Sequence, residues 1–241
     1  MVLALDAGNS RIKFGVFDNG QLLTTGHFSY EKAIESLLQL IYKYQIKTSI
    51  LSSVKKKKWN AQLSKKLNIG IIEVNCQSPF SFMVHYETPE TLGIDRLVAC
   101  EGAISLNNDE GNVLVIDAGT CLTYDYVDQD LNYQGGIISP GLQIRAQGMH
   151  NYTDNLPLVN LETKPPQLLG KTTQTCIQSG ILNGVTAEAK GIIKEIEGKH
   201  QGVKIFLTGG DLNFFENGLK SGIFAEPNLN LVGLARLAKT E

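Results

Sequence analysis

Residues 3–17 read LALDAGNSRIKFGVF, an apolar strand that passes into a polar segment and then resumes as a strand. Residues 114–127, LVIDAGTCLTYDYV, repeat this order of strand, Asp-Ala-Gly and strand. Asp6 and Asp117 hold equivalent positions 111 residues apart, a spacing typical of a domain and far longer than the period of a solenoid repeat. The chain is therefore predicted to contain two similar domains.

We name the polar segments the first elbow (residues 6–10, DAGNS) and the second elbow (residues 117–121, DAGTC). After the first elbow, apolar residues alternate with others from 12 to 16, as in a half-buried strand. The DNG sequence at 18–20 supplies residues that tolerate positive φ, which a tight hairpin turn requires. The first elbow is therefore predicted to join antiparallel strands.

Segments with apolar residues at helical spacing alternate with short apolar strands along the rest of the chain. The predicted helices cover 31–44, 56–67, 93–106, a long segment from Ile177 to Ile196, and 229–239, and further strands are predicted at 48–54 and 203–211. This alternation predicts a mixed α/β fold. The first domain is expected to span residues 1–110 and the second 111–241.

Composition argues against several classes of function. The net charge is −2 and the pI is about 6.1, so nucleic acid is not expected as a partner, because phosphate-backbone binding needs clustered Lys and Arg. Lys55–Lys58 beside Trp59 are interpreted as a solvated helix face, with a nucleic-acid contact as the alternative. No apolar run approaches the roughly 20 residues that cross a bilayer. A cytoplasmic protein without a membrane partner is expected.

The elbows have the chemistry of a phosphate site. A carboxylate at a strand end, a glycine that lets backbone amides approach closely, and neighbouring hydroxyl or amide groups suit a metal-bound phosphate tail. One Asp-x-Gly-Asn alone is more typical of an ordinary hairpin turn than of a phosphate site, but the second copy and Gly209-Gly210 after a third strand favour the phosphate interpretation. The chain has no G-x-G dinucleotide fingerprint, and GKTT at 170–173 lacks the upstream glycine of a Walker A loop.

Six motifs, DAGNS, TLGIDR, DAGTCLTYD, GGIISPG, GKTTQTCIQSG and LTGGD, occur in that order over nearly the whole chain. Together they resemble the type III pantothenate kinase family, within the superfamily of acetate and sugar kinases and actin-like ATPases. The resemblance implies two duplicated ribonuclease-H-like domains with mixed sheets flanked by helices. It also implies ATP-dependent phosphorylation of pantothenate at its primary hydroxyl, the first step toward coenzyme A.

The GIDR motif holds the residues expected to act on the acceptor. Phosphoryl transfer to an alcohol needs a base near the hydroxyl, and Asp95 is the candidate. Arg96 presents a planar fork of donors that can pair bidentately with the carboxylate of pantothenate. As neighbours at a helix start, the two side chains must point in different directions. The alternative is a surface salt-bridging Asp-Arg pair.

Further roles follow from the resemblance alone. It implies that Tyr86, Gly93, Ile94 and Thr173 contact pantothenate, with Thr173 reaching into a partner subunit's site in a homodimer. A helix cap is the alternative, or additional, role of Thr173.

The resemblance also assigns residues to ATP and to ions. It implies that Asp117 ligates a monovalent cation, potassium or ammonium, and that Thr120 contacts ATP. Asp6 is expected to orient the divalent ion, Mg²⁺, that accompanies ATP in a cleft between the domains. The full set expected to bind ATP is Asp6, Ala7, Gly8, Asn9, Ser10, Arg11, Ile12, Lys13, Thr120, Gly209 and Gly210. Lys13 is equally compatible with a solvent-facing position.

Two other functions remain open from the residues. One is a nucleotide-dependent regulatory or accessory protein, in which the nucleotide only switches conformation. The other is a superfamily kinase or phosphatase that acts on a different small acceptor.

Overall fold

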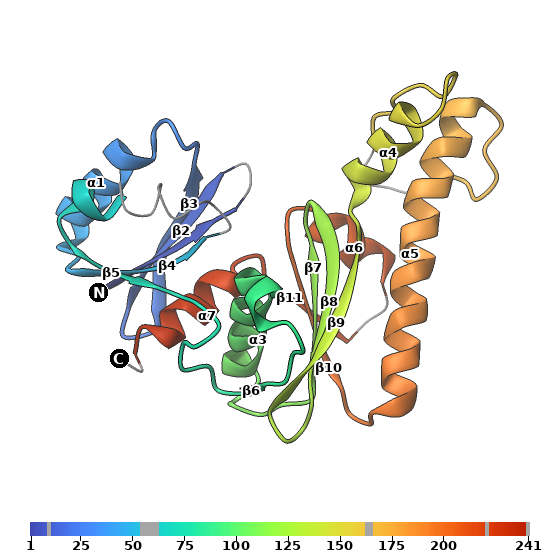
Figure 1. Cartoon of the computed structure of the whole chain (residues 1–241). Helices are drawn as coiled ribbons and strands as arrows, with labels where there is room; N and C mark the ends of the chain where they lie inside the picture. Colours follow the sequence, from blue (N-terminus) through green and yellow to red (C-terminus); the bar gives the residue numbers. More distant parts are fainter. Residues whose placement is uncertain (9–10, 54–62, 162–165, 220–221, 240–241) are drawn as a thin grey trace. The chain divides into compact units, whose positions relative to one another are not determined.

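The structure is a computed structural model, and it groups the chain into two compact units (Figure 1). It describes residues 1–8, 11–53, 63–161, 166–219 and 222–239. The first unit comprises Met1–Gly111, Leu131–Tyr133 and Asn228–Glu241, and the second comprises Asn112–Asp130 and Gln134–Pro227. The terminal segment 228–241 groups with the first unit, so the boundaries of these compact units differ from the predicted domain boundary at 110/111. That domain boundary stays a prediction from the sequence.

The first unit contains a mixed sheet with the order β3-β2-β1-β4-β5. Its strands are β1 (Val2–Ala7), β2 (Ile12–Asp18), β3 (Gln21–Phe28), β4 (Thr48–Ser53) and β5 (Gly70–Glu73). β1, β2 and β3 pair antiparallel, as predicted for the first elbow, whereas β4 runs parallel to both β1 and β5. Asn19 and Gly20 take φ of 47° and 88° in the β2–β3 turn, which confirms the predicted hairpin.

Helices cover both faces of this sheet. The helices of the first unit include α1 (Ala33–Tyr44), η1 (Pro89–Thr91), α3 (Ile94–Leu106) and α7 (Leu229–Leu237). Leu3 and Leu5 pack in a cluster with Leu37 of α1, whereas Ala4 packs in a second cluster with Val98 of α3 and Leu231 of α7. Because side chains alternate along a strand, even-numbered residues of β1 face α3 and α7.

Two glycines allow α3 and α7 to pack closely. A Cβ atom on Gly102 would collide with the carbonyl oxygen of Leu229, and one on Gly233 would collide with the carbonyl oxygen of Val98. The close crossing keeps both helices on the face of the sheet that carries the side chain of Asp6.

The second unit repeats the strand order of the first. It contains β7 (Val113–Ala118), β8 (Cys121–Val127), most of β9 (Asn132–Pro140), β10 (Lys204–Thr208) and β11 (Ile223–Ala225), in the order β11-β10-β7-β8-β9. β7 and β8 pair antiparallel, while β10 runs parallel to β7 and to β11. The helices include α4 (Leu142–Asn151), α5 (Thr173–Lys199) and α6 (Leu212–Gly218). Each unit thus has a hairpin followed by parallel strands, which confirms the predicted duplicated α/β fold.

Smaller features complete the comparison with the sequence. β6 (Met83–Val84) pairs with Asn132–Tyr133, all residues of the first unit. Residues 63–67 are helical, whereas the rest of the helix predicted at 56–67, including the lysine run, lies outside the described residues. In the described part of the chain, no helix has the length and hydropathy to cross a membrane.

The four cysteines are free thiols, but they do not share one environment. Cys100 is buried, Cys76 is partly buried, and Cys121 and Cys176 are exposed. A packing role therefore applies to Cys100 but not to the exposed thiols.

Candidate active site

Asp6 lies near the carboxyl end of β1, among polar side chains from three other elements. Lys13 of β2 is its partner in the antiparallel ladder, so their side chains project from the same face. The side chain of Asn230, near the start of α7, donates a hydrogen bond to the Asp6 carboxyl, and Asp95 lies close enough for its charge to act on Asp6. The structure therefore brings Asp95, selected as the base for the acceptor, together with Asp6 and Lys13, selected for ATP.

Burial raises the pKa of Asp6 from 3.8 to about 6. This net pKa already includes the charge of Lys13, which lowers it, the charge of Asp95, which raises it, and the hydrogen bond from Asn230, which lowers it. Because burial dominates, the ionised carboxylate is under-compensated in the protein alone. A cation bound beside Asp6 would favour the charged form.

This site fits a divalent ion that arrives with a nucleotide. Mg²⁺ is usually held by one or two carboxylates, by substrate phosphates and by water rather than by an all-protein cage. Within the described ranges, no three His, Cys, Asp or Glu residues are grouped to hold a metal. A single partly buried carboxylate of raised pKa agrees with that mode of binding.

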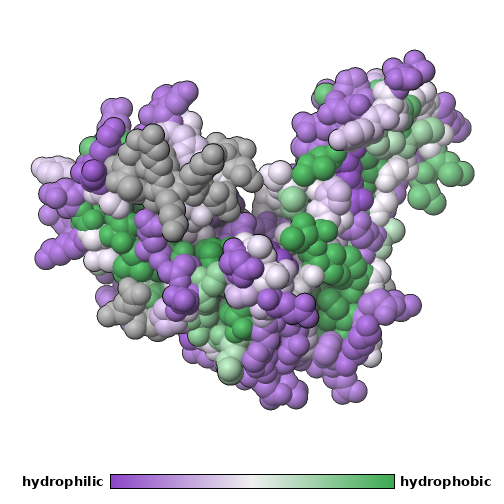
Figure 2. Space-filling view, viewed as in Figure 1, coloured by the Kyte–Doolittle hydropathy of each residue, from purple (hydrophilic) through white to green (hydrophobic). Residues whose placement is uncertain are grey.

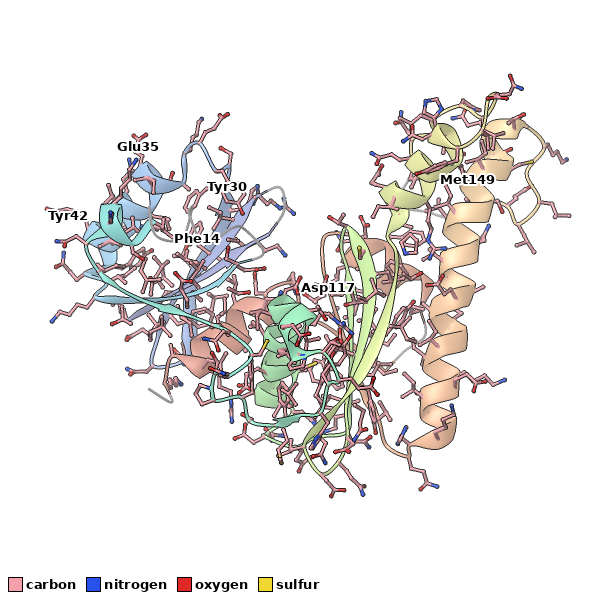
Figure 3. The ribbon with its side chains drawn as sticks, in the orientation of Figure 1. Phe14, Tyr30, Glu35, Tyr42, Asp117 and Met149 are labelled. Carbon is pink, nitrogen blue, oxygen red and sulfur yellow. The ribbon has the colours of Figure 1, made fainter. Side chains whose placement is uncertain are left out.

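The described part of the first elbow is held by Tyr30. The Tyr30 hydroxyl donates to the carbonyl oxygen of Gly8 at 2.5 Å. Burial, followed by the charge of Asp6, raises the pKa of Tyr30 to about 12, so the hydroxyl keeps its proton and remains a donor at neutral pH. Figure 3 labels Tyr30, together with Phe14 of β2, in the first unit. The contact fixes the backbone just after Asp6.

The other predicted ATP residues of the first elbow differ in what they can offer. The side chains of Ala7 and Ile12 are buried in the core, so only their backbone atoms could contact a nucleotide. Arg11 is exposed, and Lys13 is partly buried on the Asp6 face rather than fully solvent-facing. Asn9 and Ser10 lie outside the described residues.

The GIDR motif forms the start of α3. Gly93 is the residue before the helix, and a Cβ atom there would lie 2.6 Å from Oδ1 of Asp95. The same Oδ1 accepts a hydrogen bond from the backbone N–H of Arg96 at 3.0 Å. Glycine at 93 therefore leaves the space that the Asp95 carboxyl occupies.

Asp95 and Arg96, the neighbouring pair at the start of α3, differ in exposure. Asp95 is partly exposed, whereas Arg96 is only 7% exposed. A surface salt-bridging pair, the alternative interpretation, would leave both side chains in solvent. The burial of Arg96 is inconsistent with that alternative.

Tyr86 lies in a group of aromatic side chains. Its ring centroid is 6.3 Å from that of Tyr133, which is fully buried and lies at the same distance from Phe82. Phe82 in turn stacks on Phe80 at 5.3 Å. Tyr86, itself half-buried, is thus anchored on a packed aromatic row.

An ionic network centred on the buried Glu101 links this row to α3, and the sequence analysis missed it. Glu101 of α3 is 1% exposed, and its carboxylate accepts hydrogen bonds from the Ser81 backbone N–H at 2.8 Å and the Ser81 hydroxyl at 2.6 Å. Arg236 of α7 pairs with Glu101 at 2.8 Å and with Asp109 at 2.5 Å. The signal in the sequence was a single glutamate within the apolar run LVACEGAI.

Asp117 lies at the carboxyl end of β7 in the second unit (Figure 3). The turn after it is closed by a hydrogen bond from Gly119 N–H to the Cys121 carbonyl at 3.0 Å, and Thr120 is exposed at its tip. Gly141 N–H donates to the Thr120 carbonyl at 3.1 Å. The GGIISPG motif is therefore in contact with the second elbow.

Gly209 and Gly210 lie beside the second elbow. Thr208 of β10 is the register partner of Asp117, and a Cβ atom on Gly209, whose φ is 103°, would collide with the backbone of Ala118. Gly210 is exposed, with open space where its side chain would be. The structure thus brings Asp117, Thr120 and both glycines together in this unit.

Thr173 is the first residue of α5 but not its cap. The side chain of Thr172 accepts from the Thr175 backbone N–H, and the Thr175 side chain accepts from Thr172 N–H, which forms a capping box. Thr173 is exposed. The helix-cap role considered for Thr173 is therefore wrong, because the adjacent threonine fills it.

Another network in the second unit was not foreseen. Arg145 of α4 pairs with Glu188 of α5 at 2.6 Å, and the hydroxyl of the buried Tyr124 donates to Glu188 at 3.5 Å. Burial, with the charge of Glu188, raises the pKa of Tyr124. Arg145 also donates to the carbonyl of Pro140 at 2.8 Å, which ties the GGIISPG segment to α4 and α5.

Comparisons with known proteins agree on one family. A family model described as type III pantothenate kinase matches residues 2–195. The chain is 42% identical over 240 residues to the type III pantothenate kinase of Flavobacterium psychrophilum, covering 98% of each chain.

Solved structures share the fold. A protein from Campylobacter jejuni described as a conserved Baf family transcriptional activator has a TM-score of 0.65 and 21% identity, covering 99% of this chain and 98% of that one. The activator of 2-hydroxyisocaproyl-CoA dehydratase from Clostridium difficile, with bound ADPNP, has a TM-score of 0.55 and 9% identity, covering 99% and 96%. At these identities the likeness shows a shared fold alone.

Proposed function

The chain belongs to the type III pantothenate kinase family, whose reaction is the ATP-dependent phosphorylation of pantothenate in coenzyme A biosynthesis, and we propose that Asp95 is its general base. The observation that carries this assignment is that Asp95 lies close to Asp6, near enough for the charge of Asp95 to raise the pKa of Asp6. A base for the acceptor and a carboxylate suited to the divalent ion thus lie in one site.

The proposed chemistry is positioning and charge neutralisation. Asp95 accepts the proton of the pantothenate hydroxyl while the hydroxyl oxygen forms a bond to the γ-phosphorus of ATP. The bond between this phosphorus and the oxygen that leaves with ADP breaks. Arg96 pairs with the pantothenate carboxylate. The divalent ion, oriented by Asp6, neutralises phosphate charge.

The remaining contacts are proposals from the family resemblance. Tyr86, Gly93 and Ile94 line the acceptor site, and the aromatic row behind Tyr86 supports its ring. Backbone groups of Ala7, Gly8 and Ile12, with Arg11 and Lys13, contact the phosphates. For Asn9 and Ser10, the same role remains a prediction from the sequence.

In the second unit, Thr120, Gly209 and Gly210 are proposed to contact ATP, and Asp117 to ligate potassium or ammonium. The contact of Gly209 with the second elbow supports a common role for these residues. An initial-rate titration with potassium tests the cation: the rate should rise in the wild type and respond less in Asp117→Asn.

A homodimer, with Thr173 acting in the partner's site, is also proposed. The second unit exposes hydrophobic side chains, seen as green areas in Figure 2. Ile138 is 62% exposed, and a groove between β9 and α5 is lined by Ile137 and Ile192. A second copy would cover this surface, which sedimentation would detect. The cytoplasmic location stays a prediction from the sequence.

The assignment of Asp95 is tested by Asp95→Asn. Loss of a general base lowers kcat by about 10²- to 10⁴-fold, while the Kd for pantothenate should change little because Arg96 remains. A coupled ADP-release assay gives kcat and calorimetry gives the Kd. Unchanged kcat removes Asp95 from this role.

A further inference from the structure

Two buried polar atoms near Asp6 have no hydrogen-bond partner in the described structure: the hydroxyl oxygen of Ser52 and the amide oxygen Oδ1 of Asn230. Buried polar groups are nearly always hydrogen-bonded, so each such exception calls for a physical reason. Neither residue belongs to a motif that the sequence analysis selected.

Strand register places Ser52 beside Asp6. The two residues are partners in the parallel β1–β4 ladder, and side chains of paired residues project from the same face. Two positions earlier, Ala4 and Ile50 are also partners, and both pack against α3 and α7. Ser52, which is 1% exposed, therefore lies on the face that carries Asp6.

Asn230 approaches the same carboxyl from α7. Its side chain donates to Asp6, which uses the amide nitrogen and leaves Oδ1 unsatisfied. Exchanging the amide oxygen and nitrogen would direct an oxygen, which cannot donate, at the Asp6 carboxylate, so Oδ1 is the atom left unsatisfied. The site therefore contains two oxygen atoms that could accept a hydrogen bond and have no partner, one on Ser52 of β4 and one on Asn230 of α7.

The unused groups match one kind of ligand. Asp6 and Asp95 make the surroundings acidic, so a phosphate oxygen is disfavoured next to another acceptor such as Oδ1. Water bound to a divalent cation presents donors, and Mg²⁺ retains several waters when it binds with a nucleotide. Groups that hold such ligands are part of a metal site even without touching the metal.

We propose that Ser52 and Asn230 are positioning residues that hydrogen-bond the water ligands of the divalent ion bound beside Asp6. The inference rests on the proposed function, since the ion is the one that accompanies ATP. Ser52 and Asn230 thereby extend the site from the first elbow to β4 and α7.

The test compares nucleotide binding with and without the metal. Calorimetry measures the Kd of AMP-PNP in excess Mg²⁺ and in EDTA for the wild type, Ser52→Ala and Asn230→Ala. Ser49→Ala is the matched control, because Ser49 is buried on the same strand but its hydroxyl donates to the Gly70 carbonyl. Metal-free binding also reports whether each variant is folded.

Both variants should bind AMP-PNP about 10- to 100-fold more weakly in Mg²⁺, the usual effect of removing an outer partner of a metal site. Their Kd in EDTA, and both values for Ser49→Ala, should equal those of the wild type. If Mg²⁺ tightens the binding of AMP-PNP as much in the two variants as in the wild type, or if the variants bind AMP-PNP equally more weakly in Mg²⁺ and in EDTA, this inference is wrong. The proposed function is unaffected by either result. A wild type whose binding ignores Mg²⁺ overturns the inference together with the proposed role of Asp6.

Discussion

Replacing Asp6 by Asn should stabilise the protein in the absence of nucleotide and metal, although it removes a proposed active-site carboxylate. Burial raises the pKa of Asp6 from 3.8 to about 6, so the folded protein favours the neutral form more than the unfolded chain does. The resulting stabilisation is full below the unfolded pKa and is lost as the pH rises through the folded pKa. At neutral pH the ionised carboxylate is therefore a net destabilising group.

The size of the effect follows from the shift. Each pKa unit corresponds to about 1.4 kcal/mol, so the ionised Asp6 reduces the free energy of unfolding by about 3 kcal/mol near pH 8. Near pH 5, where the unfolded Asp is ionised but the folded Asp is mostly protonated, the reduction is about 2 kcal/mol. The gain from Asp6→Asn should therefore grow by about 1 kcal/mol between these two pH values.

Urea unfolding in EDTA near pH 5 and pH 8 measures this difference. Asp154→Asn, at an exposed aspartate, is the control and should show the same pH dependence as the wild type. If Asp6→Asn is less stable than the wild type at both pH values, or its gain does not grow with pH, the electrostatic description of the site is wrong. The same variant should lose about 10²-fold or more in kcat/KM, as when a preorganised charge is removed from an active site.

Two further substitutions test how the site is held. Gly93→Ala should lower kcat about tenfold or more, because the new Cβ would lie 2.6 Å from Oδ1 of Asp95 and must displace this carboxyl, and a displacement of about 1 Å in an active site can cost about 100-fold. Gly148→Ala, where a Cβ would meet no atom within 4 Å apart from its chain neighbours and the backbone of its own helix, should leave kcat unchanged. Equal rates for both variants would refute the steric argument. Glu101→Ala should lower the free energy of unfolding by about 3 kcal/mol, because it leaves Arg236 and the Ser81 N–H without their buried partner. A loss below about 1 kcal/mol in urea unfolding would mean that water replaces the carboxylate.

The sequence predicted the parts of the fold that local patterns specify. The two elbows, the hairpin turn at Asn19-Gly20 and the alternation of strands and helices follow from period, turn chemistry and internal repetition, and the structure confirms them. The place of Gly209 beside the second elbow is a consequence of the parallel β7–β10 pairing. That pairing follows from the duplicated strand order.

Contacts that depend on distant segments were not predictable in this way. Asn230 reaches Asp6 only because α7 returns to the first unit, and no local pattern links residues so far apart. Ser52 reads as an ordinary strand residue until its register with Asp6 is known. At α5, two adjacent threonines are both plausible caps by propensity, and only the backbone geometry identifies Thr172.

The most direct measurement of the central claim is the initial rate of ADP release from Mg²⁺·ATP with and without pantothenate, with the product identified by mass spectrometry. The account predicts that ADP forms only when pantothenate is present and that one phosphate is transferred per ADP, onto the primary hydroxyl. ADP release that is independent of pantothenate, or no release with it, would contradict the account.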